Sequence, residues 1–217
     1  MRIAIVNEGS TKNRNTEIME ALDGFNHTFI NAGMKNVEDE PDLSYLETGI
    51  ISAILLNLKA VDFVIGGCGT GQGFATVVLQ FPKVFCGIIF DPLDMFLYSQ
   101  INAGNCISLV LNKGYGNLGG KLNLRMIFEQ LFSVPFGKGY PEPRRAIQIA
   151  SRQKLENLSI IAHRKCIDIL KDFDKDVLSR VLKFPNILNI IKETSVDLHT
   201  DEAELKEFLI DFSKKNI

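Results

Sequence analysis

Short apolar runs alternate with longer segments through the first two thirds of the chain, and this alternation constrains the fold more than any other feature. The apolar runs cover residues 2–6, 28–30, 61–65, 84–90 and 106–111. The segments between and after them, residues 15–22, 44–58, 72–79, 93–103 and 121–132, have the length and residue content of helices. Strands that alternate with helices form a parallel sheet. The pattern therefore predicts a doubly wound α/β fold, a five-stranded parallel sheet flanked by helices.

The last third of the chain is built differently. All 17 glycines lie between Gly9 and Gly139, and residues 151–217 are rich in both basic and acidic side chains. Apolar residues recur there at helical spacing, and Pro185 and the pair Thr200-Asp201 are typical of helix starts. We therefore divide the chain into an α/β domain, residues 1–150, and a helical C-terminal extension, residues 151–217.

Composition and charge exclude several classes of protein. The net charge is −2, so the chain has no basic surplus with which to neutralise a nucleic-acid backbone. No stretch reaches the roughly 18 apolar residues of a membrane span, and the first apolar run is too short for a secretion signal. The four cysteines form no Cys-x-x-Cys pair, which favours a reducing compartment. We expect a cytoplasmic protein that binds neither nucleic acid nor membrane.

The turn after the third predicted strand is the motif most suited to chemistry. It reads Gly66-Gly67-Cys68-Gly69-Thr70-Gly71-Gln72-Gly73 and leads into a predicted helix. In doubly wound sheets, ligands bind at the carboxyl ends of the strands, and a glycine turn at a helix start aims N–H groups at an anion. The spacing fits a dinucleotide loop poorly and excludes a Walker loop. The turn therefore predicts a phosphate or oxyanion site, although glycines alone also fit a purely structural turn.

Cys68 separates this turn from an ordinary glycine loop. N–H groups at a helix start stabilise a thiolate, so Cys68 is a candidate base or nucleophile. The hydroxyl of Thr70 is near enough in sequence to bind the same substrate oxygen. Cys86, Cys106 and Cys166 have no such setting, and we interpret them as small buried residues without a chemical role.

The run from Cys68 to Gly73, preceded by an apolar strand, resembles the signature of the sugar-phosphate isomerase family that contains ribose-5-phosphate isomerase B and the galactose-6-phosphate isomerase subunits. Asp91-Pro92, Gln100-Ile101-Asn102 and Asn105 fall where that family has an acidic residue with proline, Gln-His-Asn and a further asparagine. The resemblance covers roughly residues 1–150. It implies a Rossmann-like sheet, no cofactor or metal, and a homodimer or dimer of dimers with active sites between subunits.

The resemblance also implies an activity, the aldose–ketose isomerisation of a pentose or hexose phosphate through an enediolate. Cys68 would be the base, and Thr70 would assist at the substrate hydroxyl. The remaining implied groups hold the oxyanion or the phosphate: the amides of Gly69, Gly71 and Gly73, Asn102, Lys138 and Arg144. Glu8, at the end of the first predicted strand, is a further candidate for binding the substrate.

Three departures from the family pattern leave other functions open. Ile101 stands where the family has its ring-opening histidine, and Glu8-Gly9 replaces an Asp-His pair. Tyr140 replaces the first phosphate-binding arginine, with Lys138 as the nearest cation in sequence. The chain is then alternatively a non-catalytic sugar-phosphate binder or partner subunit, or an enzyme that uses Cys68 as a nucleophile or acts on an open-chain substrate.

The three histidines and one further turn also bear on where the site lies. The histidines at positions 27, 163 and 199 are expected to be structural or solvated. The turn at residues 113–117 follows the fifth predicted strand and is a candidate wall of the cleft.

Overall fold

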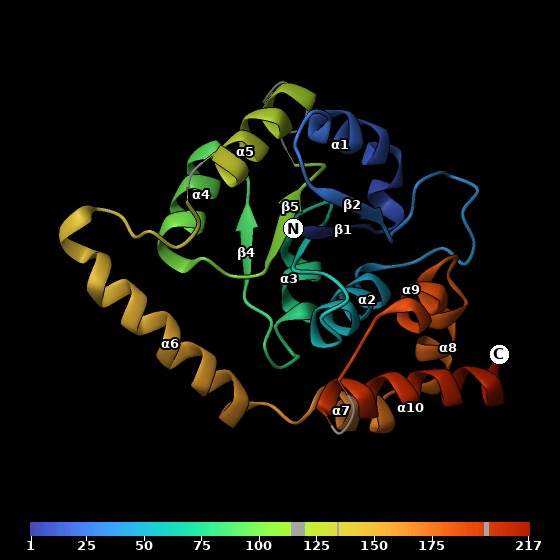
Figure 1. Cartoon of the computed structure of the whole chain (residues 1–217). Coiled ribbons are helices and arrows are strands. Elements are labelled where there is room, and N and C mark those ends of the chain that lie inside the picture. The colour runs from blue at the N-terminus through green and yellow to red at the C-terminus, as the bar shows by residue number, and fades with distance from the viewer. Residues whose placement is uncertain (114–119, 134, 198–199) are drawn as a thin grey trace.

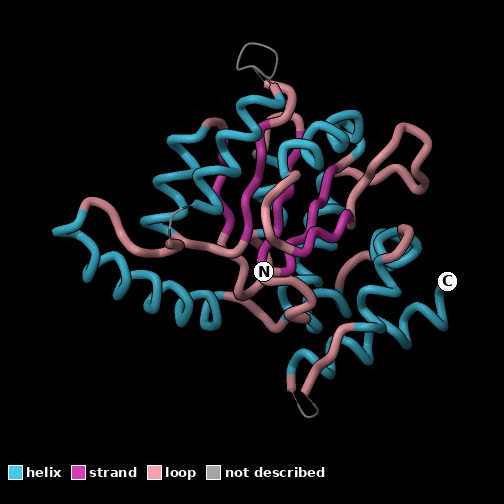
Figure 2. The backbone as a smooth tube through the Cα atoms, turned by 45° about the horizontal axis from the view of Figure 1, so that its top comes forward, coloured by secondary structure: helices cyan, strands magenta, loops and turns pink. Residues whose placement is uncertain are grey.

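The computed structural model describes residues 1–113, 120–133, 135–197 and 200–217. A five-stranded parallel sheet with the order β2-β1-β3-β5-β4 runs through the α/β domain (Figures 1 and 2). Its strands are β1 (Arg2–Asn7), β2 (Thr28–Asn31), β3 (Phe63–Cys68), β4 (Cys86–Ile89) and β5 (Cys106–Val110). The predicted Rossmann-like fold is confirmed, and the order of strands reverses between β1 and β3.

Helices cover both faces of this sheet. On one face, apolar side chains from α1 (Asn15–Leu22), α4 (Pro92–Leu97) and α5 (Lys121–Ser133) pack against alternate residues of β1 and β3. On the other face, α2 (Tyr45–Asn57) and α3 (Gln72–Val78) pack against the remaining residues of the same strands. Both faces of the inner strands are buried, which explains why these strands are continuous apolar runs.

Three short helical turns complete the α/β domain. They are η1 (Gly9–Arg14) after β1, the π-helical turn η2 (Tyr98–Asn102) after α4, and η3 (Glu142–Arg144) before α6. Glu8 caps η1, because its side chain accepts a hydrogen bond from the backbone N–H of Ser10. The chain after β1 therefore makes a tight turn at the carboxyl edge of the sheet before α1 begins.

Helix α2 is unusual because it has no polar face. Ser44 and Glu47 form a capping box at its start, and every residue from Glu47 to Asn57 is buried. One side of α2 meets the sheet and α3, and the other meets the extension. The extension therefore supplies part of the core of the α/β domain rather than a separate core.

The last five helices are α6 (Arg145–Ala162), α7 (Cys166–Asp172), α8 (Lys175–Lys183), α9 (Ile187–Glu193) and α10 (Asp201–Asn216). Helix α6 spans both sides of the expected boundary at residue 150 and projects from the domain as an arm, before the chain returns beneath α2 (Figure 1). The predicted helix start at Thr200-Asp201 is confirmed, with Thr200 as the cap of α10. The start at Pro185 is wrong by two residues, because Asn186 adopts a left-handed conformation and α9 begins after it.

Within the described ranges, no helix combines the length and the apolar content that a transmembrane segment needs.

Candidate active site

Cys68 is the last residue of β3, the central strand of the sheet. Strand β3 pairs with β1, where Gly67 lies opposite Asn7, and with β5, where Cys68 lies opposite Val110. The carboxyl ends of β1 and β3 flank the point where the strand order reverses, which is where ligands bind in doubly wound folds. The glycine turn therefore lies at the position that the sequence predicts for a site.

The backbone of this turn depends on glycine at two positions. Gly71 has a φ of +73°, a left-handed conformation that is costly for residues with a side chain, and its N–H donates to the carbonyl of Cys68 at 3.2 Å. A Cβ on Gly73 would lie 2.9 Å from the ring of Tyr45, at the first turn of α2. The turn is thus tightly folded, and α3 begins directly after it.

The thiol of Cys68 and the hydroxyl of Thr70 face each other at the mouth of this turn. Their sulfur and oxygen atoms lie 4.0 Å apart. Cys68 is only 5% exposed, whereas Thr70 is exposed. The hydroxyl of Thr70 also accepts a hydrogen bond from the N–H of Gln72 at 3.4 Å. Of the two side chains, Thr70 is therefore the one that solvent reaches.

Glu8 follows β1 and lies beside the same edge of the sheet. Its side chain is 6% exposed, and its carboxylate accepts hydrogen bonds from both the N–H and the hydroxyl of Ser10. The carbonyl of Ser10 accepts a hydrogen bond from the side chain of Asn112 at 3.1 Å, and the N–H of Asn112 donates to the carbonyl of Gly69 at 3.0 Å. The loops after β1, β3 and β5 thus form one connected wall.

Sequence reasoning missed Ser10, Asn112 and Tyr45. Asn112 directly follows a predicted strand and Ser10 lies in the turn after another, and these positions are the signal that could have found them. Tyr45 gives no comparable signal, because it meets the glycine turn only through the packing of α2. We call Glu8, Cys68, Gly69, Thr70, Gly71 and Gly73 the cysteine cluster, and the structure brings these six predicted residues together at one edge of the sheet.

The other three predicted residues, Asn102, Lys138 and Arg144, lie elsewhere in the chain, and we call them the cationic cluster. Asn102 ends η2 and precedes β5, so it lies toward the amino end of the sheet, whereas Cys68 lies at the carboxyl end. The glycines on either side of Lys138 donate hydrogen bonds to the carbonyls of Ser99 and Gln100, at 2.8 and 2.9 Å.

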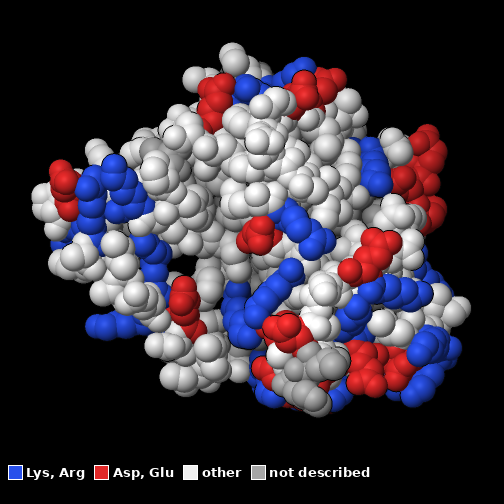
Figure 3. All heavy atoms as spheres, viewed as in Figure 1, with Lys and Arg blue, Asp and Glu red and all other residues white. Residues whose placement is uncertain are grey.

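The cationic cluster is accessible to solvent. Asn102, Lys138 and Arg144 are all exposed, and Figure 3 shows basic side chains gathered over the start of α6. The carbonyl of Ile101 accepts a hydrogen bond from Arg152 of α6 at 2.8 Å, which ties η2 to the arm. A single chain therefore presents two separate groups of predicted site residues.

Comparison with known proteins identifies the family. A family model described as Ribose/Galactose Isomerase matches residues 3–147. The chain belongs to the ribose/galactose isomerase family. Comparison with curated protein sequences gives no match.

Two solved structures resemble the whole chain, extension included. A ribose-5-phosphate isomerase from Vibrio parahaemolyticus is 35% identical, with a TM-score of 0.88, and the alignment covers 98% of this chain and 99% of that one. A 4-deoxy-L-threo-5-hexosulose-uronate ketol-isomerase, solved with a tartrate, is also 35% identical, with a TM-score of 0.88 and coverage of 97% and 100%. Both are named as isomerases, so isomerase chemistry is common to the family and to these two neighbours.

A smaller relative shares the fold of the α/β domain. The type B ribose 5-phosphate isomerase from Trypanosoma cruzi is 18% identical, with a TM-score of 0.59, and covers 75% of this chain and 100% of its own. That structure therefore has no counterpart for about a quarter of the present chain.

Two of the other cysteines, Cys106 and Cys166, are buried thiols. Burial raises the pKa of Cys106 well above its ordinary value, and burial raises the pKa of Cys166 to about 12. Both thiols therefore stay protonated at neutral pH. Among the described residues, histidine, cysteine, aspartate and glutamate side chains form no group of three that could hold a metal ion.

The described histidines lie away from the cysteine cluster. His27 precedes β2 at the amino end of the sheet, and burial, together with the charge of the N-terminal amine, lowers its pKa. The ring nitrogens of His163 lie 2.9 and 3.1 Å from the carbonyls of Ser159 and Leu79, so this ring connects α6 to the end of α3. His199 and residues 114–117 of the predicted cleft wall lie outside the described residues.

Proposed function

We propose that the protein is an aldose–ketose isomerase that uses Cys68 as its base. The observation that supports this most directly is the place of Cys68 at the end of the central strand, 4.0 Å from the hydroxyl of Thr70 and followed by a glycine turn. Membership of an isomerase family adds the reaction class.

The proposed reaction moves one proton between neighbouring carbons. The thiolate of Cys68 takes the proton from the carbon beside the carbonyl, so the C–H bond breaks, an S–H bond forms, and the electron pair leaves a negative charge on the carbonyl oxygen. The amides of Gly69 and Gly73 donate hydrogen bonds to this enediolate oxygen, while Thr70 binds the neighbouring hydroxyl. The N–H of Gly71, expected from the sequence to join them, already donates to the carbonyl of Cys68, so Gly71 shapes the turn instead. The proton of that hydroxyl then passes to the former carbonyl oxygen, while the thiol delivers its proton to the former carbonyl carbon. The neighbouring oxygen becomes the new carbonyl, Cys68 is a thiolate again, and no oxidant or cofactor is consumed.

We propose an open-chain sugar acid as the first candidate substrate. Ile101 stands where the family pattern has its ring-opening histidine, and an isoleucine side chain transfers no proton. The name of the hexosulose-uronate ketol-isomerase describes a substrate that needs no such step. A 4-deoxy-5-ulose lacks the hydroxyls on carbons 4 and 5 that close five- and six-membered sugar rings. An acyclic hexosulose uronate therefore fits both the neighbour and the isoleucine.

A pentose or hexose phosphate is the second candidate. The neighbour from Vibrio parahaemolyticus is named for ribose 5-phosphate, and Lys138 and Arg144 supply cations that suit a phosphate. The same cations suit the carboxylate of a uronate. The chemistry shared by the two candidates is therefore a small anionic sugar, and substrate trials separate them.

We further propose that the protein works as a homodimer in which the cationic cluster of one copy faces the cysteine cluster of the other. Helix α6 supports this proposal, because nearly all of its residues are exposed although many are apolar. The exposed apolar residues of α6 are Ile147, Ile149, Leu155, Leu158, Ile160 and Ile161. Between this helix and the edge strand β4 lies a largely apolar cavity of about 540 Å³, whose wall includes Asn102. Apolar surface of this extent indicates a partner, and a second copy would also unite the two clusters.

Incubation of the purified protein in heavy water tests the proposed reaction. The trial substrates are 4-deoxy-L-threo-5-hexosulose uronate, ribose 5-phosphate and a hexose 6-phosphate. We expect deuterium at the carbon next to the carbonyl and formation of the isomer, both detected by NMR, with the uronate turned over fastest. Tight binding without exchange would support the non-catalytic alternative, and no exchange with any of the three would refute the proposed reaction.

A further inference from the structure

Residues 42–47, here called the rim segment, lead into the first turn of α2 and contact the loop that follows β1. The N–H of Gly9 donates to the carbonyl of Leu43 at 2.6 Å, and the ammonium of Lys12 lies 3.0 Å from the carboxylate of Asp42. Glu8, the predicted ligand in the cysteine cluster, immediately precedes Gly9. The rim segment therefore holds the loop that contains Glu8.

The rim segment also contacts the glycine turn. The ring of Tyr45 lies so close to Gly73 that a Cβ there would be 2.9 Å from it. The place of Tyr45 is set by the capping box, in which the carboxylate of Glu47 accepts hydrogen bonds from the N–H and the hydroxyl of Ser44. A shift of the rim segment would consequently move both loops that form the cysteine cluster.

One side chain of the C-terminal extension binds both ends of this segment. Arg180, on α8, places its Nε 3.2 Å from Oε1 of Glu47, and one of its terminal nitrogens donates to the carbonyl of Asp42. Glu47 is 6% exposed at its side chain, so its charge is largely shielded from water, and the guanidinium is its ionic partner. Because the guanidinium is planar and has several donors, it fixes the two contacts relative to each other.

We propose that Arg180 is a positioning residue for the isomerisation, through which the C-terminal extension holds the rim segment against the cysteine cluster. This inference rests on the proposed function for its effect on the reaction, but its structural part stands on the contacts of Arg180 alone. It assigns a role to the extension. That role is to stiffen the site rather than to supply a group that touches the substrate.

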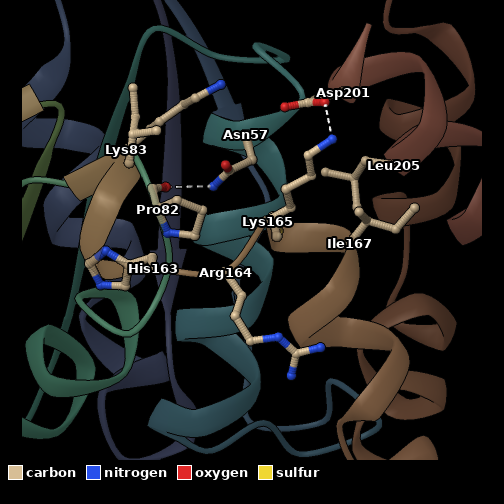
Figure 4. Close-up of a pocket in the computed structure, with 11 residues that line it drawn as sticks. Asn57, Pro82, Lys83, His163, Arg164, Lys165, Ile167, Asp201 and Leu205 are labelled. Carbon is tan, nitrogen blue, oxygen red and sulfur yellow. Dashed lines mark hydrogen bonds and ion pairs between the residues drawn. The ribbon is translucent and has the colours of Figure 1, made fainter. Parts of the chain in front are cut away.

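The chain offers a matched control in Arg164, at the start of the extension. Like Arg180, it is partly exposed and binds one carboxylate and one backbone carbonyl, those of Asp172 at 2.7 Å and Asp168 at 3.2 Å. Both partners belong to the extension itself. Figure 4 shows Arg164 at a separate cavity, beside the ion pair of Lys165 with Asp201. Loss of Arg164 removes one bond to a carboxylate and one to a carbonyl without touching the rim segment, although Asp172 is more exposed than Glu47.

Amide hydrogen exchange and steady-state kinetics on full-length variants test the proposal. Arg180→Ala should speed exchange in peptides that cover residues 8–13 and 42–48, and should lower kcat/KM at least about tenfold, since small misplacements of reacting groups are costly. Arg164→Ala should change neither. Arg180→Lys keeps a cation beside Glu47 and should recover the melting temperature of the wild type and part of its kcat/KM.

The outcomes separate this proposal from the proposed function. Equal effects of Arg180→Ala and Arg164→Ala on kcat/KM would show that Arg180 only stabilises the fold and would overturn the inference. Unchanged exchange in both peptides would overturn it too. If the wild type turns over no trial substrate, the proposed function fails, and the exchange experiment still decides whether Arg180 positions the rim segment.

Discussion

Replacement of Cys68 by alanine separates a catalytic thiol from a structural one, because the chain contains a matched second thiol. Cys68 and Cys166 are each 5% exposed and belong to the same buried apolar cluster. Each substitution removes one sulfur atom from that cluster, which should cost about 1 kcal/mol of unfolding free energy on the scale of a buried methylene. For a chain of 217 residues this lowers the melting temperature by roughly 2–4 °C.

The two variants should differ sharply in turnover. A positioned general base contributes about 10²–10⁴-fold to the rate, so Cys68→Ala should lose deuterium exchange by that factor, whereas Cys166→Ala should keep the wild-type rate. The assay follows deuterium incorporation by NMR, alongside thermal melts of all three proteins. Turnover of Cys68→Ala within a few-fold of wild type, or equal losses in both variants, would refute Cys68 as the base.

Three further predictions concern the glycine turn, the anchoring of the extension and the arm. Gly71→Ala should cost more than about 1–2 kcal/mol, because its φ is +73° and a Cβ there would lie 3.0 Å from Val110, and it should also lower turnover. Gly24→Ala, at a φ of +82° with open space around it, should cost about 1–2 kcal/mol and leave turnover intact. Glu202 forms an ion pair with Lys59; burial opposes ionisation of Glu202, but the hydrogen bond and the charge of Lys59 lower its pKa overall. The ion pair therefore stabilises the fold above about pH 4.3, and this contribution is lost as the pH falls below that value. Denaturation curves should show Glu202→Gln less stable than wild type by under about 1 kcal/mol at pH 7 and equal to it near pH 3; a constant gap would contradict this. Ile161 is 81% exposed in a single chain. Ile161→Asp should convert the proposed dimer into monomers, as measured by sedimentation, without loss of secondary structure. A monomeric wild type would contradict the proposed dimer.

The sheet and the location of the cysteine cluster could be predicted because they depend on local patterns. Apolar runs specify the inner strands, and five closely spaced glycines mark the turn after β3. The capping box at Ser44 and the capping threonine at position 200 are equally local. Each of these features is fixed by residues within one or two turns of each other in the chain.

Other features depend on contacts between distant residues, which no local pattern contains. Asn102 and Arg144 fit the family motifs, but their place relative to Cys68 depends on the tertiary fold, in which η2 ends at the amino end of the sheet. The pairing of Arg180 with Glu47 joins positions far apart in sequence. The course of α6 away from the domain follows from the tertiary fold rather than from its own residues (Figure 1).

The burial of α2 on every side has a consequence for how shorter and longer members of this family relate to one another. In this chain α7 and α8 cover a surface of α2 that residues such as Ile51 and Leu55 keep apolar. A homologue without these helices must cover the equivalent surface with another chain or carry polar residues on it. Truncation of the present chain near residue 150 should therefore uncover apolar surface and yield an aggregation-prone fragment.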